Sequence, residues 1–355
     1  MALCPRWPQA VAARQDLNVM NTGFTNSPPE RPGPDYAVVV VAYRSRPLLS
    51  RMLAKMPESA PVIVVDNSAD YDDLTDLIRA RPKTTYIDSG GNIGFGPACN
   101  LAASVIAEPL IAFVNPDADV DGRLLGMLAR EIDRDPRCSS CGPILVDDEG
   151  HARSGSGGWL PSPWRALIHA TGLFRFFPRS GIGVGSIDDS RVEVEWIAGT
   201  CLMIRRTTFL ELGGFAPQYF LYQEDMDLGR RLQERRYRQI LRGDLRVRHV
   251  AGTSTELQDV RHLAWRRASA LVDYVTATHR RQTARLICAV LASGMLLRAL
   301  YALLRFRPAR LEEFLIHART LGFPDRTLTR LRVEQQARRT VTPAMSEPLM
   351  RSHRG

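Results

Sequence analysis

Two aspartates that follow an apolar run are the first residues whose types and spacing could do chemistry. Residues 110–114 read as a buried strand, and an Asn-Pro turn then leads to Asp117 and Asp119. Ligands of open α/β sheets lie beyond the carboxyl ends of the strands, so both carboxylates are expected at a ligand site. Neighbouring carboxylates repel one another, and Mg²⁺ or Mn²⁺ relieves that repulsion while bridging to phosphate oxygens. Ordinary turn chemistry is the alternative, with Asp119 or Asp121 capping the next helix.

A second acidic group lies about a hundred residues later. Glu224, Asp225 and Asp227 fall on or just before an expected helix, and neighbouring aromatic residues could remove water from one of them. The positive end of a helix dipole explains one acid in the first turn, but it explains three poorly. A strand expected over residues 239–250 ends near His249, which is either structural or a ligand of the same site.

Two further turns have the composition of a nucleotide pocket. Asp66 ends a strand, where its carboxylate could accept hydrogen bonds from a base or a ribose, and an Asx turn is the equal alternative. The Gly-rich turn over residues 90–96 opens a helix, and its backbone could approach an anion closely. This turn is not a dinucleotide fingerprint, because that motif follows the first strand, where this chain has Tyr43-Arg44-Ser45-Arg46.

The elements that must position these residues alternate between strand and helix. Strands are expected over residues 37–42, 61–66, 84–88, 110–114, 192–206 and 239–250, with helices over 47–56, 71–81, 97–107, 122–134 and from about 224. This alternation predicts right-handed βαβ units and an α/β fold with a mostly parallel, Rossmann-like sheet flanked by helices. Residues 150–190 lack a clear period, so we expect a long loop there. Its aromatic residues either form an acceptor- or membrane-facing surface or pack beneath the loop.

Composition limits the class of protein. A chain of 355 residues with 45% hydrophobic and 24% charged residues can form a large globular α/β domain. The net charge of +9 comes from residues 276–355, which contain fifteen arginines and five acidic residues, because the remaining residues are nearly balanced, with 32 basic and 33 acidic side chains. That confinement favours a membrane surface over nucleic acid as the partner of the charge. Six scattered cysteines and the lack of a secretory signal predict a reduced, cytoplasmic chain.

Four regions follow from these patterns. We expect a flexible, Pro-rich leader over 1–35, the α/β domain over 36–275, an apolar and basic helical extension over 276–330, and a basic flexible tail over 331–355. Within the extension, residues 286–304 are apolar but contain Arg298, and their unbroken part is too short to span a bilayer. An interfacial helix beside flanking arginines is the favoured interpretation, and a helix packed on the catalytic domain is the alternative.

Seven motifs in order resemble an inverting family 2 glycosyltransferase with the GT-A fold. They are VVVVAYRS, VVDNSAD, GGNIGFGPACN, FVNPDAD, WIAGTCLMIRR, GGFAPQYFLYQEDMDLGRR and RVRHVAG, within residues 37–253. The Asn-Ile-Gly-Phe-Gly and Asn-Pro-Asp forms resemble the rhamnosyltransferase branch that acts on lipid-linked cell-envelope glycans. The family's Q-x-x-R-W motif of processive members is not matched, because His262 follows Arg261, so we expect transfer of a single sugar.

The resemblance implies roles for individual residues. Ala42, Tyr43 and Asp66 match the pocket for base and ribose, Asn92 and Gly94 match the turn that shapes it, Asp117 and Asp119 match the D-x-D motif, Gly199 and Thr200 match the segment beside the donor sugar and diphosphate, Asp225 with Glu224 matches the general base, and His249 matches a contact to metal or diphosphate. Asp119 is expected to be the direct metal ligand, with Mg²⁺ or Mn²⁺ as the cofactor.

The resulting hypothesis is a metal-dependent transferase. It would move one sugar, for which L-rhamnose from dTDP-rhamnose is the first choice, to a hydroxyl of a glycan or lipid-linked acceptor. The expected location is the cytoplasmic face of the cell membrane, with a peripheral membrane contact and no nucleic-acid partner. A nucleotidyltransferase and a non-catalytic nucleotide- or membrane-binding protein are the competing hypotheses, since fold alone does not decide function.

Overall fold

The β-branched runs of the N-terminal half form the parallel part of one sheet. This computed structural model describes residues 19–21, 35–69, 71–177, 179–184, 191–249 and 260–341. Four strands lie side by side and parallel in the order β4-β3-β2-β5: β2 (Tyr36–Ala42), β3 (Val62–Asp66), β4 (Thr84–Asp88) and β5 (Leu110–Val114). Every residue of β3 and β5 is buried, as expected for strands covered on both faces.

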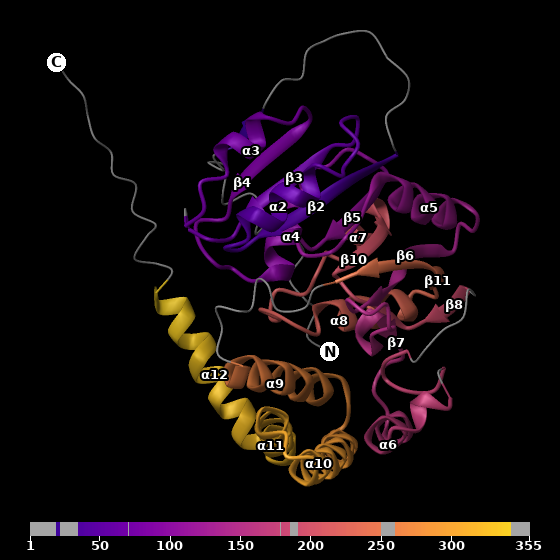
Figure 1. Cartoon of the computed structure of the whole chain (residues 1–355), viewed down its shortest axis with the longest axis vertical. Coiled ribbons are helices and arrows are strands. Elements are labelled where there is room, and N and C mark those ends of the chain that lie inside the picture. The colour runs from indigo at the N-terminus through magenta and orange to yellow at the C-terminus, as the bar shows by residue number, and fades with distance from the viewer. Residues whose placement is uncertain are drawn as a thin grey trace, which may run out of the picture. The chain divides into compact units, whose positions relative to one another are not determined.

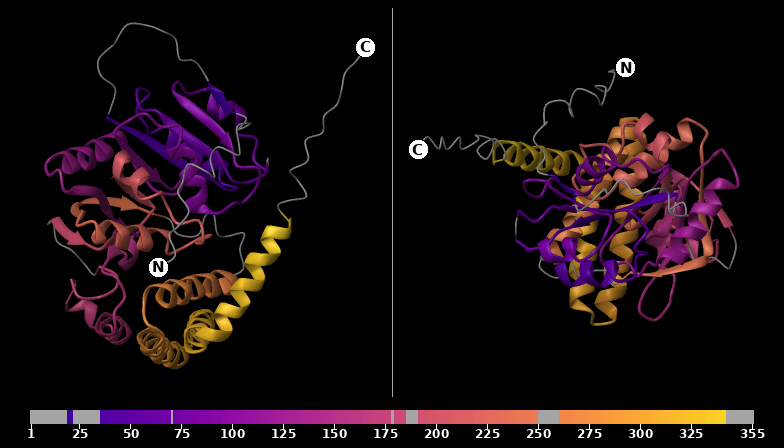
Figure 2. Two further views of the ribbon diagram at one scale, coloured as in Figure 1. Left: turned by 180° about the vertical axis from the view of Figure 1, so that it is seen from behind. Right: turned by 90° about the horizontal axis from the view of Figure 1, so that it is seen from above.

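The second half of the sheet contains a reversed strand. β10 (Cys201–Arg205) lies antiparallel between β5 and β6 (Cys138–Val146), β11 (Arg238–Arg248) is parallel to β6, and β8 (Arg191–Val194) closes the edge. With β1 (Val19–Asn21) beside β4, nine described strands form the sheet, and six of them run in one direction. The prediction of a mostly parallel α/β sheet is confirmed. Figure 1 shows the colour passing from indigo β2 and β3 to orange β11 across it, and Figure 2 shows the same sheet from behind and from above.

Helices follow the strands and pack on the sheet. They are α2 (Arg46–Leu53), α3 (Thr75–Arg79), α4 (Phe95–Ala103), α5 (Gly122–Asp133), α7 (Arg206–Glu211) and α8 (Glu224–Glu234). Among them, α4 contacts β2 and β3, α5 contacts β6 and β10, and α8 contacts β11 and the short strand β9 (Trp196–Ile197). An aromatic cluster fills the space behind β5, where the ring centroid of Phe113 lies 5.0 Å from that of Phe209 and 5.1 Å from that of Phe215.

Two expectations from the sequence were incomplete. No strand is predicted over Cys138–Val146, yet all nine residues are buried in β6. Its first five residues are Cys, Ser and Gly, so it lacks the continuous apolar run that is typical of a strand buried on both faces. The expected loop over residues 150–190 contains η1 (Ser154–Ser156), β7 (Gly157–Gly158), α6 (Pro163–Thr171) and η2 (Leu173–Arg175). β7 pairs with β9 in a small separate sheet.

The chain divides into two compact units at residues 259 and 260. The second unit contains α9 (Val260–Thr278), α10 (Arg281–Leu304), α11 (Pro308–Gly322) and α12 (Pro324–Val341), and α10 packs on α11 and α9. The boundary that the sequence predicts, at residue 275, falls within α9. The predicted start of the tail, at residue 331, falls within α12, which continues to Val341. Residues 342–355 and most of the expected leader lie outside the described residues, although β1 falls within that leader.

Candidate functional site

The residues predicted for a nucleotide pocket lie at the carboxyl ends of β2 and β3. Ala42 pairs with Asp66 in the strand register, and the Ala42 carbonyl accepts a 2.8 Å hydrogen bond from the Asn67 N–H. The buried Asp66 carboxylate accepts bonds from the Ser68 N–H (2.8 Å) and the Tyr86 hydroxyl (3.0 Å). One Asp66 carboxylate oxygen therefore forms the Asx turn with Ser68, and the other accepts the bond from Tyr86. Tyr43 follows Ala42 and is partly exposed.

Asn67 fixes the Gly-rich turn against the end of β3. Its amide donates to the Asn92 side-chain oxygen (3.1 Å) and to the Gly94 carbonyl (3.4 Å), and its own side-chain oxygen accepts from Ser89 and from the Ile93 N–H, each at 3.0 Å. These four bonds account for both groups of a buried amide. These bonds fix the shape of the turn that contains Asn92 and Gly94.

The Gly-rich turn also contacts the segment in front of α8. The Phe95 N–H donates a 3.0 Å bond to the Phe220 carbonyl. Gly94 has φ 96°, and a Cβ atom there would overlap the same carbonyl, so both the backbone conformation and the close approach require glycine. The ring of Phe95 lies against Gly199, where a Cβ atom would come within 2.9 Å of it. The predicted donor turn is therefore in direct contact with the segment that precedes the predicted catalytic helix.

The acidic turn after β5 places its first aspartate beside the predicted histidine. A β-bridge joins Ala118 to His249, and His249 Nε2 lies 3.3 Å from Asp117 Oδ1. The side chains are 8% and 17% exposed, for Asp117 and His249 respectively. Ligands at neighbouring positions around a divalent ion, each at about 2.1 Å from it, are separated by about 3 Å. The two side chains have the chemistry and the spacing of such a pair.

The Asp119 side chain has basic partners instead of the histidine. Its carboxylate pairs with Lys55 and lies 3.7 Å from Arg248 Nη2, and its side chain is 37% exposed. It lines a cavity of about 670 Å³ together with Lys55, Asp121 and Arg246. Asp121, not Asp119, caps α5, because its carboxylate accepts from the Leu124 N–H at 2.8 Å. The geometry thus groups His249 with Asp117, whereas the sequence favours Asp119 as the direct ligand.

Backbone hydrogen bonds join this turn to the predicted catalytic helix. The Asn115 N–H donates to the Thr200 carbonyl (2.9 Å), and the N–H of the adjacent Gly199 donates to Asp225 Oδ2 (3.3 Å). Because β10 is antiparallel to β5, the start of β10 meets the end of β5. Residues separated by more than a hundred positions in the sequence therefore lie in one continuous group.

The start of α8 combines backbone strain with incompletely paired polar groups. Tyr222 and Gln223 both have φ 72°, which is costly for residues other than glycine and is typical of functional sites. Within the described residues, Gln223 Oε1 and Glu224 Oε2 are buried without a hydrogen-bond partner. Burial raises the pKa of Glu224 to about 8, with the charge of Asp225 adding to the effect. Burial also raises the pKa of Asp225 to about 6, although the N–H groups of Met226 and Gly199 oppose that rise.

Several residues of the site escaped the sequence analysis. Asn67, Phe220 and Asn100 position the turns; Asn100 exchanges two 2.8 Å bonds with the backbone of Phe215 and so ties α4 to the segment before α8. Only the proximity of Asn67 to Asp66 signalled such a role. The partners of Phe220 and Asn100 lie more than a hundred residues away, and no local pattern reports such contacts.

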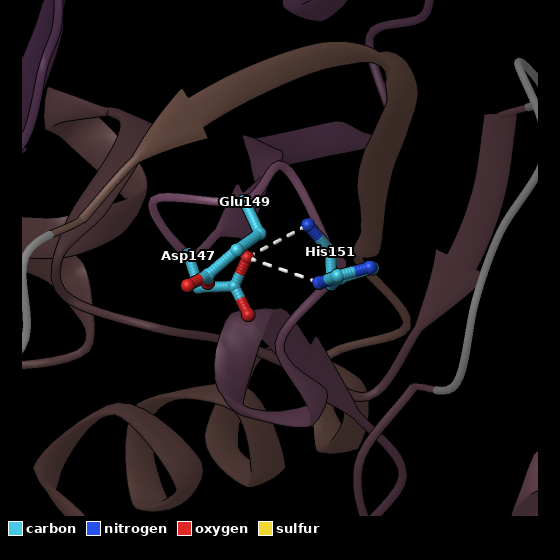
Figure 3. Close-up of side chains that lie close together, drawn as sticks. All are labelled: Asp147, Glu149 and His151. Atoms are coloured by element: carbon cyan, nitrogen blue, oxygen red, sulfur yellow. Dashed lines mark hydrogen bonds and ion pairs between the residues drawn. The ribbon is translucent and has the colours of Figure 1, made fainter.

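A separate group of potential metal ligands lies in the turn after β6. Figure 3 shows Asp147, Glu149 and His151, whose ligand atoms lie within 4.8 Å of one another. Asp147 Oδ1 accepts a 2.8 Å bond from the His151 N–H and lies 3.6 Å from the imidazole. These bonds explain the cluster as an ordinary exposed turn, and we assign no metal to it.

Comparison with known proteins identifies the family. A family model described as "Glycosyltransferase like family 2" matches residues 32–268. The chain belongs to this family. It is therefore an enzyme, a glycosyltransferase, and the predictions of the family and of the enzyme class are confirmed.

Named relatives of this glycosyltransferase include rhamnosyltransferases. An N-acetylglucosaminyl-diphospho-decaprenol L-rhamnosyltransferase of Mycobacterium tuberculosis is 28% identical over 246 residues, which cover 64% of this chain and 80% of the relative. Rhamnosyltransferase WbbL of Escherichia coli is 25% identical over 205 residues, which cover 55% and 75%. A mannosyltransferase from Pyrobaculum calidifontis, solved with GDP-Man and Mn²⁺, has a similar fold, with a TM-score of 0.54 at 15% identity over 83% of this chain and 91% of that one.

Proposed function

We propose that this glycosyltransferase moves one L-rhamnose from dTDP-rhamnose to a hydroxyl of a cell-envelope glycan or lipid-linked acceptor, with inversion at the anomeric carbon. The named rhamnosyltransferases support the sugar. The observation that carries the mechanism is the hydrogen-bonded group formed by the turn after β5, the start of β10 and the start of α8. It brings an acidic turn and a separate carboxylate to one edge of the sheet.

Asp225 is the proposed general base. Its pKa lies above the ordinary value for aspartate but below neutrality, so at neutral pH it is a carboxylate that can accept the proton of an acceptor hydroxyl. The Gly199 N–H holds one carboxylate oxygen in place. As the proton leaves, the hydroxyl oxygen attacks the anomeric carbon from the face opposite the nucleotide, and the bond to the diphosphate breaks. Glu224, whose pKa is raised further, is proposed to remain largely protonated beside it.

The donor would lie along the ends of β2, β3 and β5. Ala42, Tyr43 and Asp66 would contact the base and ribose, Asn92 and Gly94 would shape the pocket, and Gly199 and Thr200 would lie beside the sugar and diphosphate. Asp117 and His249 fit a divalent ion, since an aspartate oxygen and an imidazole nitrogen lie 3.3 Å apart with little exposure. When bound, Mg²⁺ or Mn²⁺ would supply a positive charge that stabilises the departing diphosphate. Asp119 would then support the turn through Lys55 and Arg248.

A peripheral contact of the second unit with the cytoplasmic face of the membrane is also part of the proposal. α10 is the helix of the described residues that is long and apolar enough to cross a membrane, and 39% of its apolar window is buried within the protein. Its exposed side carries large apolar residues, namely Leu286, Leu296, Leu297, Leu300, Leu303 and Leu304. A helix that packs on one side and exposes leucines on the other suits the bilayer surface better than its interior.

Thermal unfolding with a panel of nucleotide sugars tests the donor assignment. A ligand that binds the native state raises its stability, so dTDP-rhamnose with Mn²⁺ should raise the unfolding temperature more than UDP-, GDP- and other dTDP-sugars. The same experiment with a chelator should remove most of that rise. A larger shift with another sugar would replace the rhamnose assignment.

A further inference from the structure

The helix α6 and the turn after it form an exposed apolar surface on the catalytic unit. Its members, called here the α6 surface, are Trp164 (67% exposed), Leu167 (43%), Leu173 (43%), Phe176 (79%) and Phe177 (61%). Tryptophan and phenylalanine are rarely so exposed in soluble domains, and clustered apolar surfaces mark sites of interaction. Figure 1 shows α6 at the margin of its unit, beyond β7.

This exposure is built into the fold. α6 has a complete cap at each end, because the Ser162 hydroxyl accepts from the Arg165 N–H and Gly172 ends the helix with φ 77°. The Arg165 guanidinium makes two bonds to the Glu195 carboxylate, at 2.6 and 3.0 Å. In the segment that follows η2, the Ile182 carbonyl accepts a 3.1 Å bond from the Trp196 indole N–H. These bonds fix the backbone around α6, while its large apolar side chains remain exposed.

The charge of the segment has one sign. Residues 159–184 contain three arginines, one histidine and no acidic residue. Arg165 is engaged by Glu195, whereas neither Arg175 nor Arg179 forms an ion pair with any residue that the structure describes. Large aromatic side chains beside free arginines are typical of surfaces that enter the interface of an anionic membrane.

The α6 surface is connected to the catalytic residues through β9. Ile197, the last residue of β9, is separated from Gly199 by a single residue, and the N–H of Glu195 just before β9 donates to the Gly158 carbonyl at 2.7 Å. β9, which pairs with β7, thus leads directly into the turn whose Gly199 N–H contacts Asp225. One short strand therefore joins the segment that carries α6 to the turn that contacts Asp225.

We propose that the α6 surface docks the catalytic unit onto an anionic lipid bilayer. Phe176, Phe177 and Trp164 enter the interface, and Arg175 and Arg179 contact lipid phosphates. The benefit of this contact rests on the proposed function, because a lipid-linked acceptor presents its reacting sugar at that surface. The contact itself is a binding property that can be measured without any sugar transfer.

Co-sedimentation of the full chain with vesicles tests the proposal. The vesicles contain phosphatidylcholine with phosphatidylglycerol, or phosphatidylcholine alone. Replacing Trp164, Phe176 and Phe177 together by serine should lower binding to the anionic vesicles about tenfold or more, since these residues supply most of the apolar area of the surface. The control Val105→Ser removes an exposed apolar residue of the catalytic unit outside the α6 surface and should leave binding unchanged.

The arginines are tested separately. Arg175→Gln with Arg179→Gln should weaken binding to anionic vesicles by about fivefold for each charge and should leave the weak binding to phosphatidylcholine unaltered. Arg51→Gln with Arg79→Gln, which removes the same charge from α2 and α3, should have little effect. Leu300→Ser with Leu304→Ser in α10 measures the share of the second unit, and the loss caused by the α6 variant should persist in that background.

Fluorescence locates the contact. Anionic vesicles should shift the tryptophan emission of the parent protein to shorter wavelength, and Trp164→Phe should retain binding while losing most of that shift. Equal vesicle binding by the parent and the triple serine variant would overturn the proposal. So would a parent that ignores vesicles and self-associates in analytical ultracentrifugation through the same three residues, because a second copy would then cover the surface. If vesicle binding depends on α6 but no nucleotide sugar is turned over, the proposed function fails and this inference stands.

Discussion

The proposed donor side and the proposed base side of the site differ in how completely their polar groups are paired. At the ends of β2 and β3, Asp66 and Asn67 have partners for every side-chain oxygen and amide group. At the start of α8, Gln223 Oε1 and Glu224 Oε2 are buried without a partner among the described residues, on a backbone with two consecutive left-handed residues. The ends of β2 and β3 are thus fully hydrogen-bonded, whereas the start of α8 keeps backbone strain and two polar atoms without a described partner, as the proposed acceptor contact there would require.

The largest effect is expected on the base side. Asp225→Asn should lower sugar transfer by about a thousandfold while leaving donor binding largely intact, because it removes the proton acceptor but keeps the shape. The rate is measured as nucleotide release in the presence of acceptor, and donor binding by calorimetry. Glu234→Gln at the exposed end of α8 removes the same charge and should be nearly neutral. Turnover close to that of the parent would exclude Asp225 as the base.

Next in size is the effect of the acidic turn. Asp117→Asn should weaken metal-dependent donor binding about tenfold or more, whereas Asp119→Asn should change it only slightly, because Asp119 is already paired with Lys55 and Arg248. Calorimetry with and without Mn²⁺ measures both. The opposite order would restore Asp119 as the direct ligand.

On the donor side, Asn67→Ala should destabilise the protein. The substitution leaves several buried partners unpaired, at a cost of about 2–3 kcal/mol, and it should release the Gly-rich turn and weaken donor binding. Thermal unfolding and donor titration measure the two effects. Unchanged stability would mean that the turn keeps its shape without Asn67.

The smallest effect has the opposite sign and depends on pH. Burial raises the pKa of Glu224, so the native state holds its proton where the unfolded chain has lost it, and the ionised group costs stability as pH rises. Glu224→Gln should therefore raise the unfolding temperature by a few degrees at pH about 8 and above, and by less as pH falls toward the ordinary glutamate value. A stabilisation that is constant with pH would contradict the raised pKa. A higher unfolding temperature for Glu224→Gln together with a lower one for Asn67→Ala would sharpen the contrast between the two proposed sides.

The sequence predicts the parallel half of the fold well and the contacts of the site only in part. Strands such as Val62–Asp66 and Leu110–Val114 are recognisable because they are continuous apolar runs, and the ends of those runs identify Asp66, Asp117 and Asp119. The different partners of Asp117 and Asp119 were not predictable, because a bridge between Ala118 and His249, which are 131 positions apart, decides which carboxylate faces the histidine. The exposure of Trp164 and Phe176 was likewise not predictable, because it depends on which distant segments pack against them.

The reversed strand β10 has a consequence for how such a site can change. The turn after β5 and the turn before β10 are held together by main-chain bonds, from the register of Val114 with Cys201 to the bond between Asn115 and Thr200. Main-chain bonds survive almost any replacement of side chains. The spacing between the two turns therefore depends on the backbone rather than on the side chains that the turns carry, so substitutions in either turn are expected to leave that spacing unchanged.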